Sequence, residues 1–205
     1  GGFMKKVLIT GAGRGIGLAL TKEFATKGYQ VIGTYRDADT AKELLKLSKE
    51  MPSVVAVTAD VSDETTFAPL KDQLKKIKEI DILINNSGII GDKRASLLEV
   101  DLNNVNEVLD VNTLGSMRIS KLVIPFMNKN GTVAQITSQM GSITDNRSGG
   151  YYAYRMSKAA LNMFNMCLSK EFTNLTCLAL HPGGVQTEMG GSGATVTTQD
   201  CAAGL

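Results

Sequence analysis

The sequence predicts an α/β fold: a single Rossmann-like domain with a doubly wound parallel sheet and helices on both faces. Two observations lead to this prediction. Short runs of β-branched and apolar residues, typical of strands buried on both faces, alternate with longer helical patterns along the 205 residues. A glycine-rich segment, residues 11–17, separates the first such strand from the first helix. Alternation of this kind implies right-handed crossovers, and we expect the strand order 3-2-1-4-5-6.

The predicted elements follow one another without a linker or an internal repeat. Each strand is a compact apolar run, expected near residues 5–10, 30–35, 53–59, 80–85, 132–137 and 175–180. Each helix has apolar residues at helical spacing, expected near residues 16–27, 40–49, 63–77, 101–128 and 151–172. We therefore expect residues 1–205 to form one domain, with residues 1–3 before Met4 a tag remnant.

The glycine-rich segment follows the first strand and begins the first helix. A phosphate group can bind there to free backbone N–H groups, and glycine is needed because a Cβ would block the turn or the phosphate. Gly11, Gly15 and Gly17 have the spacing G-x-x-x-G-x-G, whereas the commoner G-x-G-x-x-G does not fit. With its strand before it and its helix after it, the segment predicts a dinucleotide pyrophosphate site rather than a plain loop.

The end of the second predicted strand bears on the choice of cofactor. NAD enzymes usually place an acid there to bind the ribose 2′-OH, and NADP enzymes a basic residue to bind the 2′-phosphate. The order here is Tyr35-Arg36-Asp37. Arg36, together with Arg14 in the glycine segment, favours NADP(H), because two guanidinium groups can bind one phosphate. Asp37 leaves NAD(H) open, since it could bind the ribose if the register differed by one residue.

The third to sixth predicted strands are also followed by small or polar residues. The carboxyl ends of parallel strands meet at one edge of the sheet, so these residues should gather in one crevice. After the third strand come Asp60 and Val61, after the fourth Asn86, Ser87 and Gly88, after the fifth Ser138, and after the sixth Pro182, Gly183, Val185 and Thr187.

Tyr154 and Lys158 lie one helical turn apart in the predicted helix 151–172. Positions i and i+4 share a helix face, so the ammonium group can lie beside the phenol. A free tyrosine titrates near pH 10 and is a poor acid-base catalyst at neutrality, but a held positive charge favours the phenolate. The pair is therefore a candidate proton donor. If the pair is considered without the other motifs, the alternative is a surface helix on which Tyr and Lys are four residues apart by chance. Tyr151 and Tyr152 are rival phenols, but neither has a lysine four residues later.

Taken together and in this order, the motifs resemble the short-chain dehydrogenase/reductase family over essentially the whole chain. The family's T-G-x-x-x-G-x-G matches residues 10–17, its N-N-A-G matches residues 85–88 with serine for alanine, and its P-G-x-V-x-T matches residues 182–187. Within the family, the chain looks most like the small carbonyl reductases related to the C-factor and sniffer proteins.

The resemblance implies an oxidoreductase that transfers a hydride between NADP(H) and a carbonyl or alcohol substrate. In the implied tetrad, Ser138 holds the substrate oxygen, Tyr154 supplies its proton, Lys158 holds the nicotinamide ribose and Asn112 anchors a relaying water. The implied cofactor-binding residues, among which Asp60 holds the adenine amino group, are Gly11, Arg14, Gly15, Ile16, Gly17, Arg36, Asp60, Val61, Asn86, Ser87, Gly88, Tyr154, Lys158, Pro182, Gly183, Val185 and Thr187.

The alternative is a non-catalytic NADP(H)-binding sensor or signalling protein on the same fold. Such a protein needs only the glycine segment and Arg36, so the presence of all four tetrad residues favours the enzyme. The substrate itself is not readable from the sequence. The segment between Ser138 and Tyr154 is longer than is usual in the family, and we expect a loop insertion to absorb the difference. Gly184 stands where relatives tend to have a large residue, so we expect a more open cleft.

Composition narrows the class of protein further. The net charge of +2, with both signs interspersed, predicts no nucleic-acid or membrane partner, and no apolar run approaches the roughly 18 residues of a membrane span. The three cysteines lack the spacing of a disulfide framework, which predicts reduced thiols. The sequence has no Cys/His/Asp cluster with the spacing of metal ligands, so we expect no metal site. We expect a cytoplasmic enzyme with a small-molecule carbonyl substrate. The resemblance also implies a homo-oligomer, either a dimer or a tetramer, whose interfaces bury the helices near 101–128 and 151–172.

Overall fold

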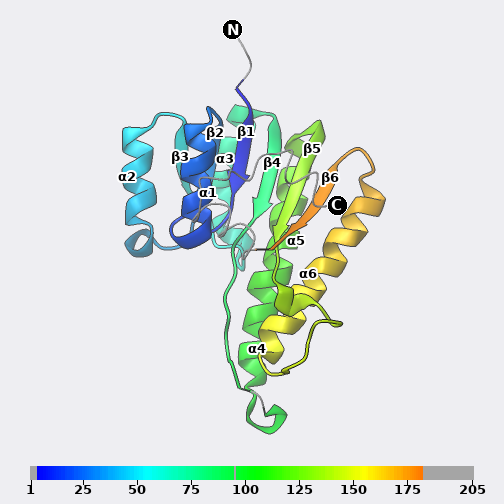
Figure 1. Cartoon of the computed structure of the whole chain (residues 1–205). Coiled ribbons are helices and arrows are strands. Elements are labelled where there is room, and N and C mark those ends of the chain that lie inside the picture. Colours follow the sequence, from blue (N-terminus) through cyan, green and yellow to red (C-terminus); the bar gives the residue numbers. More distant parts are fainter. Residues whose placement is uncertain (1–3, 95, 182–205) are drawn as a thin grey trace.

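The computed structural model describes residues 4–94 and 96–181. Six strands form one sheet, in which all the pairings are parallel and the order is β3-β2-β1-β4-β5-β6 (Figure 1). This is the predicted order, 3-2-1-4-5-6. The strands are β1 (Lys6–Ile9), β2 (Gln30–Tyr35), β3 (Val54–Thr58), β4 (Ile80–Asn85), β5 (Met127–Ile136) and β6 (Thr176–Leu180).

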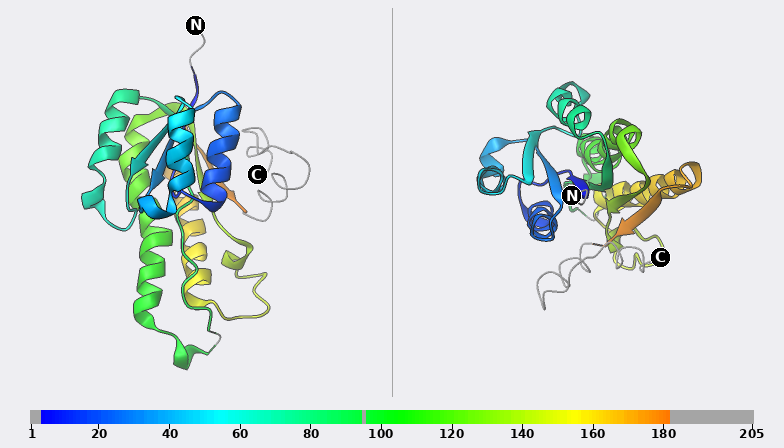
Figure 2. Two further views of the ribbon diagram at one scale, coloured as in Figure 1. Left: turned by 90° about the vertical axis from the view of Figure 1, so that its left-hand side faces the viewer. Right: turned by 90° about the horizontal axis from the view of Figure 1, so that it is seen from above.

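Helices cover both faces of the sheet (Figure 2). The α-helices are α1 (Gly15–Thr26), α2 (Lys42–Glu50), α3 (Ala68–Ile77), α4 (Leu102–Leu109), α5 (Gly115–Val123) and α6 (Tyr152–Glu171). One core packs α1 and α2 against the sheet, and the other packs α3, α5 and α6 against the opposite face. Val7 and Ile9 belong to the first core and Leu8 to the second, and all three are fully buried. This burial on both sides explains why the strands are nearly continuous apolar runs.

The predicted helix 101–128 is present as one continuous helical stretch over residues 102–126, but it is not a regular α-helix throughout. α4 ends at Leu109, a π-helical turn spans Asp110–Leu114, and α5 follows it. The apolar periodicity continues through both helices, so it does not reveal the turn between them. Pro125 lies in a short 3₁₀ turn that ends the helical stretch, because proline lacks the N–H that a helix interior needs. β5 therefore begins at Met127, five residues before the predicted position near 132.

The predicted helix 63–77 begins later than expected. A 3₁₀ turn, Glu64–Thr66, comes first, and the Asp63 side chain caps it by accepting a hydrogen bond from the Thr65 N–H. α3 then begins at Ala68 with a proline in its first turn, a position where the missing N–H costs nothing.

The strands all point toward the end of the molecule from which α4 and the first turns of α6 project (Figure 1). The carboxyl edge of the sheet therefore faces the space beside these two helices. The order of the strands reverses between β1 and β4, which is where open α/β sheets bind ligands. Among the described residues, no helix combines the length and apolarity needed to cross a membrane.

Candidate functional site

A cleft of about 290 Å³ opens at the carboxyl edge, at the point where the strand order reverses. Ten of the sequence-predicted cofactor residues line it: Gly11, Arg14, Gly15, Ile16, Arg36, Asp60, Val61, Asn86, Ser87 and Gly88. Six residues that the prediction did not include also line it: Gly13, Tyr35, Thr40, Ala59, Ile89 and Val111. These follow the strand ends or lie one position from a predicted residue, so the crevice expected from parallel topology is present.

The glycine segment forms a turn that favours glycine at three positions. Gly11 and Gly15 have φ values of +61° and +56°, in the left-handed region that favours glycine. A Cβ on Gly17 would lie 2.1 Å from the carbonyl oxygen of Gly11, so any side chain there would collide with the backbone. The N-terminus of α1 has neither a side-chain cap nor an acidic residue in its first turn. Its unpaired N–H groups therefore suit a phosphate.

Hydrogen bonds join the glycine segment to the turn after β4. The Thr10 hydroxyl accepts from the N–H groups of Asn86 and Ser87 at 3.0 and 3.2 Å. The Asn86 amide donates to the carbonyl oxygen of Gly11 at 3.1 Å. The two neighbouring loops are thus held as one wall of the cleft, which explains a threonine before the glycines and an asparagine after β4.

The end of β2 distinguishes Arg36 from Asp37. Arg36 lines the cleft, whereas Asp37 is not among its lining residues. The Asp37 carboxylate caps the 3₁₀ turn Ala38–Thr40 instead, accepting from the Asp39 N–H at 2.9 Å. At the end of β3, Asp60 lines the cleft, and its Oδ1 accepts from the N–H and hydroxyl of Ser62 at 2.9 and 2.7 Å.

The predicted Tyr154–Lys158 pair is present on α6. The Nζ atom of Lys158 lies 5.6 Å from the centre of the Tyr154 ring. Lys158 is only 4% exposed, and it donates to the carbonyl oxygen of Ile136 at 2.9 Å. Burial lowers the pKa of Lys158 from 10.5 to about 8, because the charged form loses its hydration. A Cβ on Gly88 would lie 3.5 Å from this Nζ, so Lys158 reaches the wall of the cleft.

Asn112 lies in the π-helical turn between α4 and α5 and is fully buried. Its amide donates to the carbonyl oxygen of Ile89 at 2.8 Å and to the hydroxyl of Ser157 at 3.0 Å, while its Oδ1 accepts from the Ile89 N–H at 2.8 Å. The Ser157 hydroxyl in turn donates to the backbone oxygen of Tyr154 at 2.8 Å. Sequence reasoning missed Ser157, which ties Asn112 to the helix that carries Tyr154 and Lys158.

Ser138 caps the 3₁₀ turn Gln139–Gly141 and accepts from the Met140 N–H at 3.1 Å. A Cβ on Gly141 would lie 2.9 Å from the Cβ of Lys158, so the turn packs closely on α6. The structure thus brings Ser138 to the helix of the pair. The predicted residues Pro182, Gly183, Val185 and Thr187 lie outside the described residues.

The described residues hold two unpaired cysteines, Cys167 and Cys177, and burial raises the pKa of the Cys177 thiol. Within the same ranges, no group of three or more His, Cys, Asp or Glu residues could bind a metal ion.

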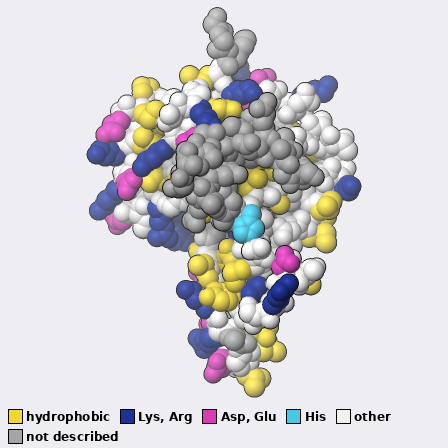
Figure 3. All heavy atoms as spheres, in the orientation of Figure 1, with side chains coloured by type: hydrophobic (Ala, Val, Ile, Leu, Met, Phe, Trp, Pro, Cys, Tyr) yellow, Lys and Arg dark blue, Asp and Glu magenta, His cyan; other side chains and the backbone are white. Residues whose placement is uncertain are grey.

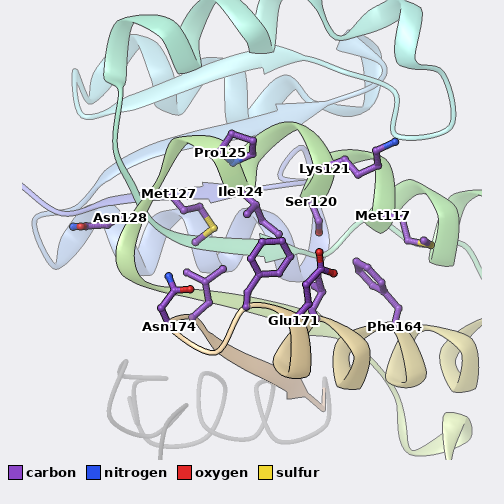
Figure 4. A pocket seen from close by; sticks show the side chains of 13 residues that line it. Met117, Ser120, Lys121, Ile124, Pro125, Met127, Asn128, Phe164, Glu171 and Asn174 are labelled. Carbon is purple, nitrogen blue, oxygen red and sulfur yellow. The ribbon is translucent and has the colours of Figure 1, made fainter.

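A larger cavity, of about 630 Å³, lies between α5 and α6 (Figure 4). Its lining includes Met117, Ile124, Phe164 and Leu168, and it reaches Met127 at the start of β5. That is the amino end of the strand, whereas the cleft lies at the carboxyl edge. Size therefore does not identify the site here. The smaller cleft is lined by the glycine turn and the uncapped N-terminus of α1, and the Nζ atom of Lys158 lies at its wall beside Gly88.

Comparison with known proteins agrees with this geometry. The family model described as short chain dehydrogenase matches residues 5–195. The C-signal protein of Myxococcus xanthus is 40% identical over 130 residues, which cover 62% of this chain and 78% of that protein. A carbonyl reductase from Pseudomonas aeruginosa PAO1, solved in complex with NADP, superposes with a TM-score of 0.85 at 31% identity, covering 97% of this chain and 92% of that one. The carbonyl reductase Sniffer of Drosophila melanogaster gives 0.82 at 29% identity, covering 88% and 81%.

Proposed function

The chain belongs to the short-chain dehydrogenase family and is an NADP(H)-dependent oxidoreductase, and from that premise we propose that it reduces a carbonyl group with Tyr154 as the general acid. The observation that carries the proposal is the position of Lys158. Its Nζ lies 5.6 Å from the Tyr154 ring and close to Gly88 in the wall of the dinucleotide cleft. One ammonium group is thus beside both the proton donor and the cofactor site.

The cleft fits a dinucleotide. The uncapped N-terminus of α1 would hold the pyrophosphate beside Gly15, where a Cβ would project into open space and meet no protein atom within 4 Å. Gly17 lets this turn form, because a Cβ there would collide with the Gly11 backbone. Arg36 and Arg14 would bind the 2′-phosphate, and Asp60 the adenine amino group. When bound, the nicotinamide supplies the hydride that the substrate carbon receives. The remaining predicted residues, Pro182, Gly183, Val185 and Thr187, stay a prediction for the nicotinamide end.

Each residue of the tetrad has a different role in binding or protonating the substrate oxygen. The Ser138 hydroxyl donates to the carbonyl oxygen and stabilises the negative charge that develops on it. The Tyr154 hydroxyl gives this oxygen its proton, and the ammonium of Lys158 favours the phenolate that remains. Asn112 positions these groups through Ser157. Both of its amide N–H groups bond within the protein, so a water that it anchors must donate to one of its oxygens.

Turnover tests the proposal against the non-catalytic alternative. NADPH oxidation is followed at a panel of aldehydes, ketones and quinones, and NADPH binding is titrated in parallel. We expect oxidation with at least one carbonyl class and a preference for NADPH over NADH. A protein that binds NADPH tightly but oxidises it with no member of the panel would support the sensor or signalling reading instead.

Arg36→Ala should weaken NADPH binding about 10- to 100-fold and leave NADH binding nearly unchanged. Hydrogen bonds to charged groups contribute about 1.5–3 kcal/mol, and only NADPH has the 2′-phosphate that this guanidinium would bind. Fluorescence titration of both cofactors measures the effect. Asp37→Ala is the matched control: it removes the cap of a 3₁₀ turn, and NADPH affinity should persist. Equal losses of NADH and NADPH in Arg36→Ala would favour Asp37 and NAD(H).

The expected dimer or tetramer stays a prediction, as does the cytoplasmic location. Exposed methionines support an interface on the predicted helices, because large apolar side chains in water favour association. These are Met117 on α5 and Met156, Met163 and Met166 on α6.

A further inference from the structure

A third cavity, of about 340 Å³, lies beside the residues that follow the proposed catalytic ones. It is lined by Gln139, Met140, Asp145, Arg147 and Arg155. Gln139 directly follows Ser138, and Arg155 directly follows Tyr154. The remaining three lining residues, Met140, Asp145 and Arg147, lie between Ser138 and Tyr154, in the segment that is longer than in most of the family. We call this space the arginine cavity.

Two guanidinium groups line the arginine cavity without a carboxylate partner. Neither Arg147 nor Arg155 forms an ion pair within the part of the chain that the structure describes. Arg147 is exposed, and no hydrogen bond of its side chain to another described residue is found. A pair of arginines that forms no ion pair with a described carboxylate is an electrostatic arrangement that suits an anion, in particular one with two or three oxygens in a plane or fork.

Arg155 is held in place by the same segment. Its Nε donates to the carbonyl oxygen of Gly150 at 3.1 Å, and one terminal nitrogen donates to the Ser148 hydroxyl at 3.0 Å. An arginine has five N–H donors, so three remain for a ligand. Two local bonds fix the segment itself: Gly149 N–H to Asn146 Oδ1 at 2.9 Å, and Asp145 N–H to Ser142 Oγ at 3.2 Å. A guanidinium fixed before binding loses less conformational freedom when the ligand arrives.

We propose that the arginine cavity binds an anionic group of the substrate, and that the enzyme therefore prefers carbonyl compounds that carry a carboxylate or phosphate a few bonds from the reacting carbon. The inference rests on the proposed function, since it places the reacting carbonyl between Ser138 and Tyr154. Gln139 and Arg155 are the next residues after Ser138 and Tyr154, so their Cα atoms are only about 3.8 Å from those of the two catalytic residues. The single acid of the lining, Asp145, opposes the two arginines and leaves the set with an excess of one positive charge.

The test compares two aldehydes of the same shape and different charge, 4-formylbenzoate and its methyl ester, with 4-formylphenyl phosphate as the phosphate arm. The parent should have a higher kcat/KM for the anions than for the ester. Arg147→Gln and Arg155→Gln should each lower kcat/KM for the anions about 5- to 20-fold and change that for the ester less than twofold, because only the anions lose a charge-assisted hydrogen bond. The larger loss among the two anions identifies which group the cavity fits.

Two further variants sharpen the test. Asp145→Asn should raise kcat/KM for the anions, since it removes the opposing charge. Lys129→Gln is the control, since it removes the same charge: Lys129 is exposed near the amino end of β5, far along the strand from its carboxyl end at Ile136, and the substitution should have no selective effect. An unchanged ester rate in Arg155→Gln also shows that the loss of its bonds to residues 148 and 150 has not unfolded the site.

Equal changes for anions and ester in both arginine variants, or a parent without preference for the anions, would overturn the inference while leaving carbonyl reduction intact. If no aldehyde is reduced, the proposed function fails on its own. The anion subsite is then decided by ligand-observed NMR titration of 4-formylbenzoate and its ester into the protein with NADP⁺. Tighter binding of the anion that Arg147→Gln abolishes would still support the subsite, and its absence would refute it.

Discussion

Tyr154→Phe should lower kcat about 10²- to 10⁴-fold and leave NADPH binding nearly unchanged. This range is the usual contribution of general acid catalysis, and the substitution removes only the hydroxyl oxygen. The ring stays, so its 5.6 Å approach to the ammonium of Lys158 can persist. The backbone oxygen of Tyr154 also keeps its bond from Ser157, so the position of α6 should not change. The expected loss is therefore chemical rather than structural.

Steady-state kinetics with a reactive aldehyde and NADPH titration measure the two quantities separately. Tyr152→Phe is the matched control, because Tyr152 is a half-buried phenol on the same helix without a lysine four residues later. Its kcat should stay within about twofold of the parent. A Tyr154→Phe variant that keeps more than half of the parental rate would remove Tyr154 as the proton donor. A large loss in Tyr152→Phe would transfer that role to the neighbouring phenol.

The fold was predictable because its signals are local and repeated. Each strand is buried on both faces, as with Leu8 in one core and Val7 and Ile9 in the other, and so each appears in the sequence as a continuous apolar run. The π-helical turn inside the predicted helix 101–128 was not predictable, for the converse reason. The turn, at Asp110–Leu114, leaves the apolar periodicity nearly intact, so nothing in the pattern marks it.

The cofactor cleft was predictable because parallel topology brings strand ends together whatever their separation in sequence. Which of Arg36 and Asp37 lines this cleft was not predictable, because both follow β2 and a shift of one residue in register exchanges their positions. In the structure Arg36 lines the cleft, and the Asp37 carboxylate caps a short turn. An aspartate such as Asp37 can either face a ligand or accept a hydrogen bond from the backbone two residues later, and sequence spacing does not show which of the two it does.

The residues that sequence reasoning missed act through contacts between distant segments. Ser157, which is 45 residues from Asn112 in the sequence, joins this asparagine to the backbone of Tyr154. Its only sequence signal is a small polar residue beside Lys158 on the inward face of a helix. Arg147 lies in a segment identified only as longer than usual, and Arg155 lies on α6 directly after Tyr154. Their common cavity depends on how that segment folds back on α6, which no periodicity encodes.

Lys158→Met should abolish most turnover and at the same time stabilise the ligand-free protein near neutral pH. The loss of one charge that stabilises the developing phenolate is expected to cost about 10²–10³ in kcat. The gain in stability follows from burial: Lys158 is 4% exposed, and burial lowers its pKa from 10.5 to about 8. Keeping the charge buried below pH 8 therefore costs about 3 kcal/mol, at about 1.4 kcal/mol per pKa unit. The bond lost at the Ile136 carbonyl offsets part of the gain.

The pH dependence isolates this effect from the cost of the lost bond. The folded-state pKa of Lys158 lies below the unfolded one, so the unfolded state of the parent binds more protons between about pH 8 and 10.5. The free energy of unfolding of the parent therefore rises as the pH increases through this interval, and the full cost of the buried charge applies below about pH 8. The variant lacks that change. Its advantage in free energy of unfolding should shrink by about 2 kcal/mol between pH 7 and pH 9.5, since this interval spans about 1.5 pH units above the folded-state pKa. Urea unfolding of the ligand-free proteins at both pH values gives the difference. Lys129→Met, which replaces an exposed lysine, should track the parent at both. An advantage of Lys158→Met that is equal at pH 7 and pH 9.5 would mean that the buried ammonium is not the source, and that water or a counter-charge reaches Lys158 in the resting enzyme.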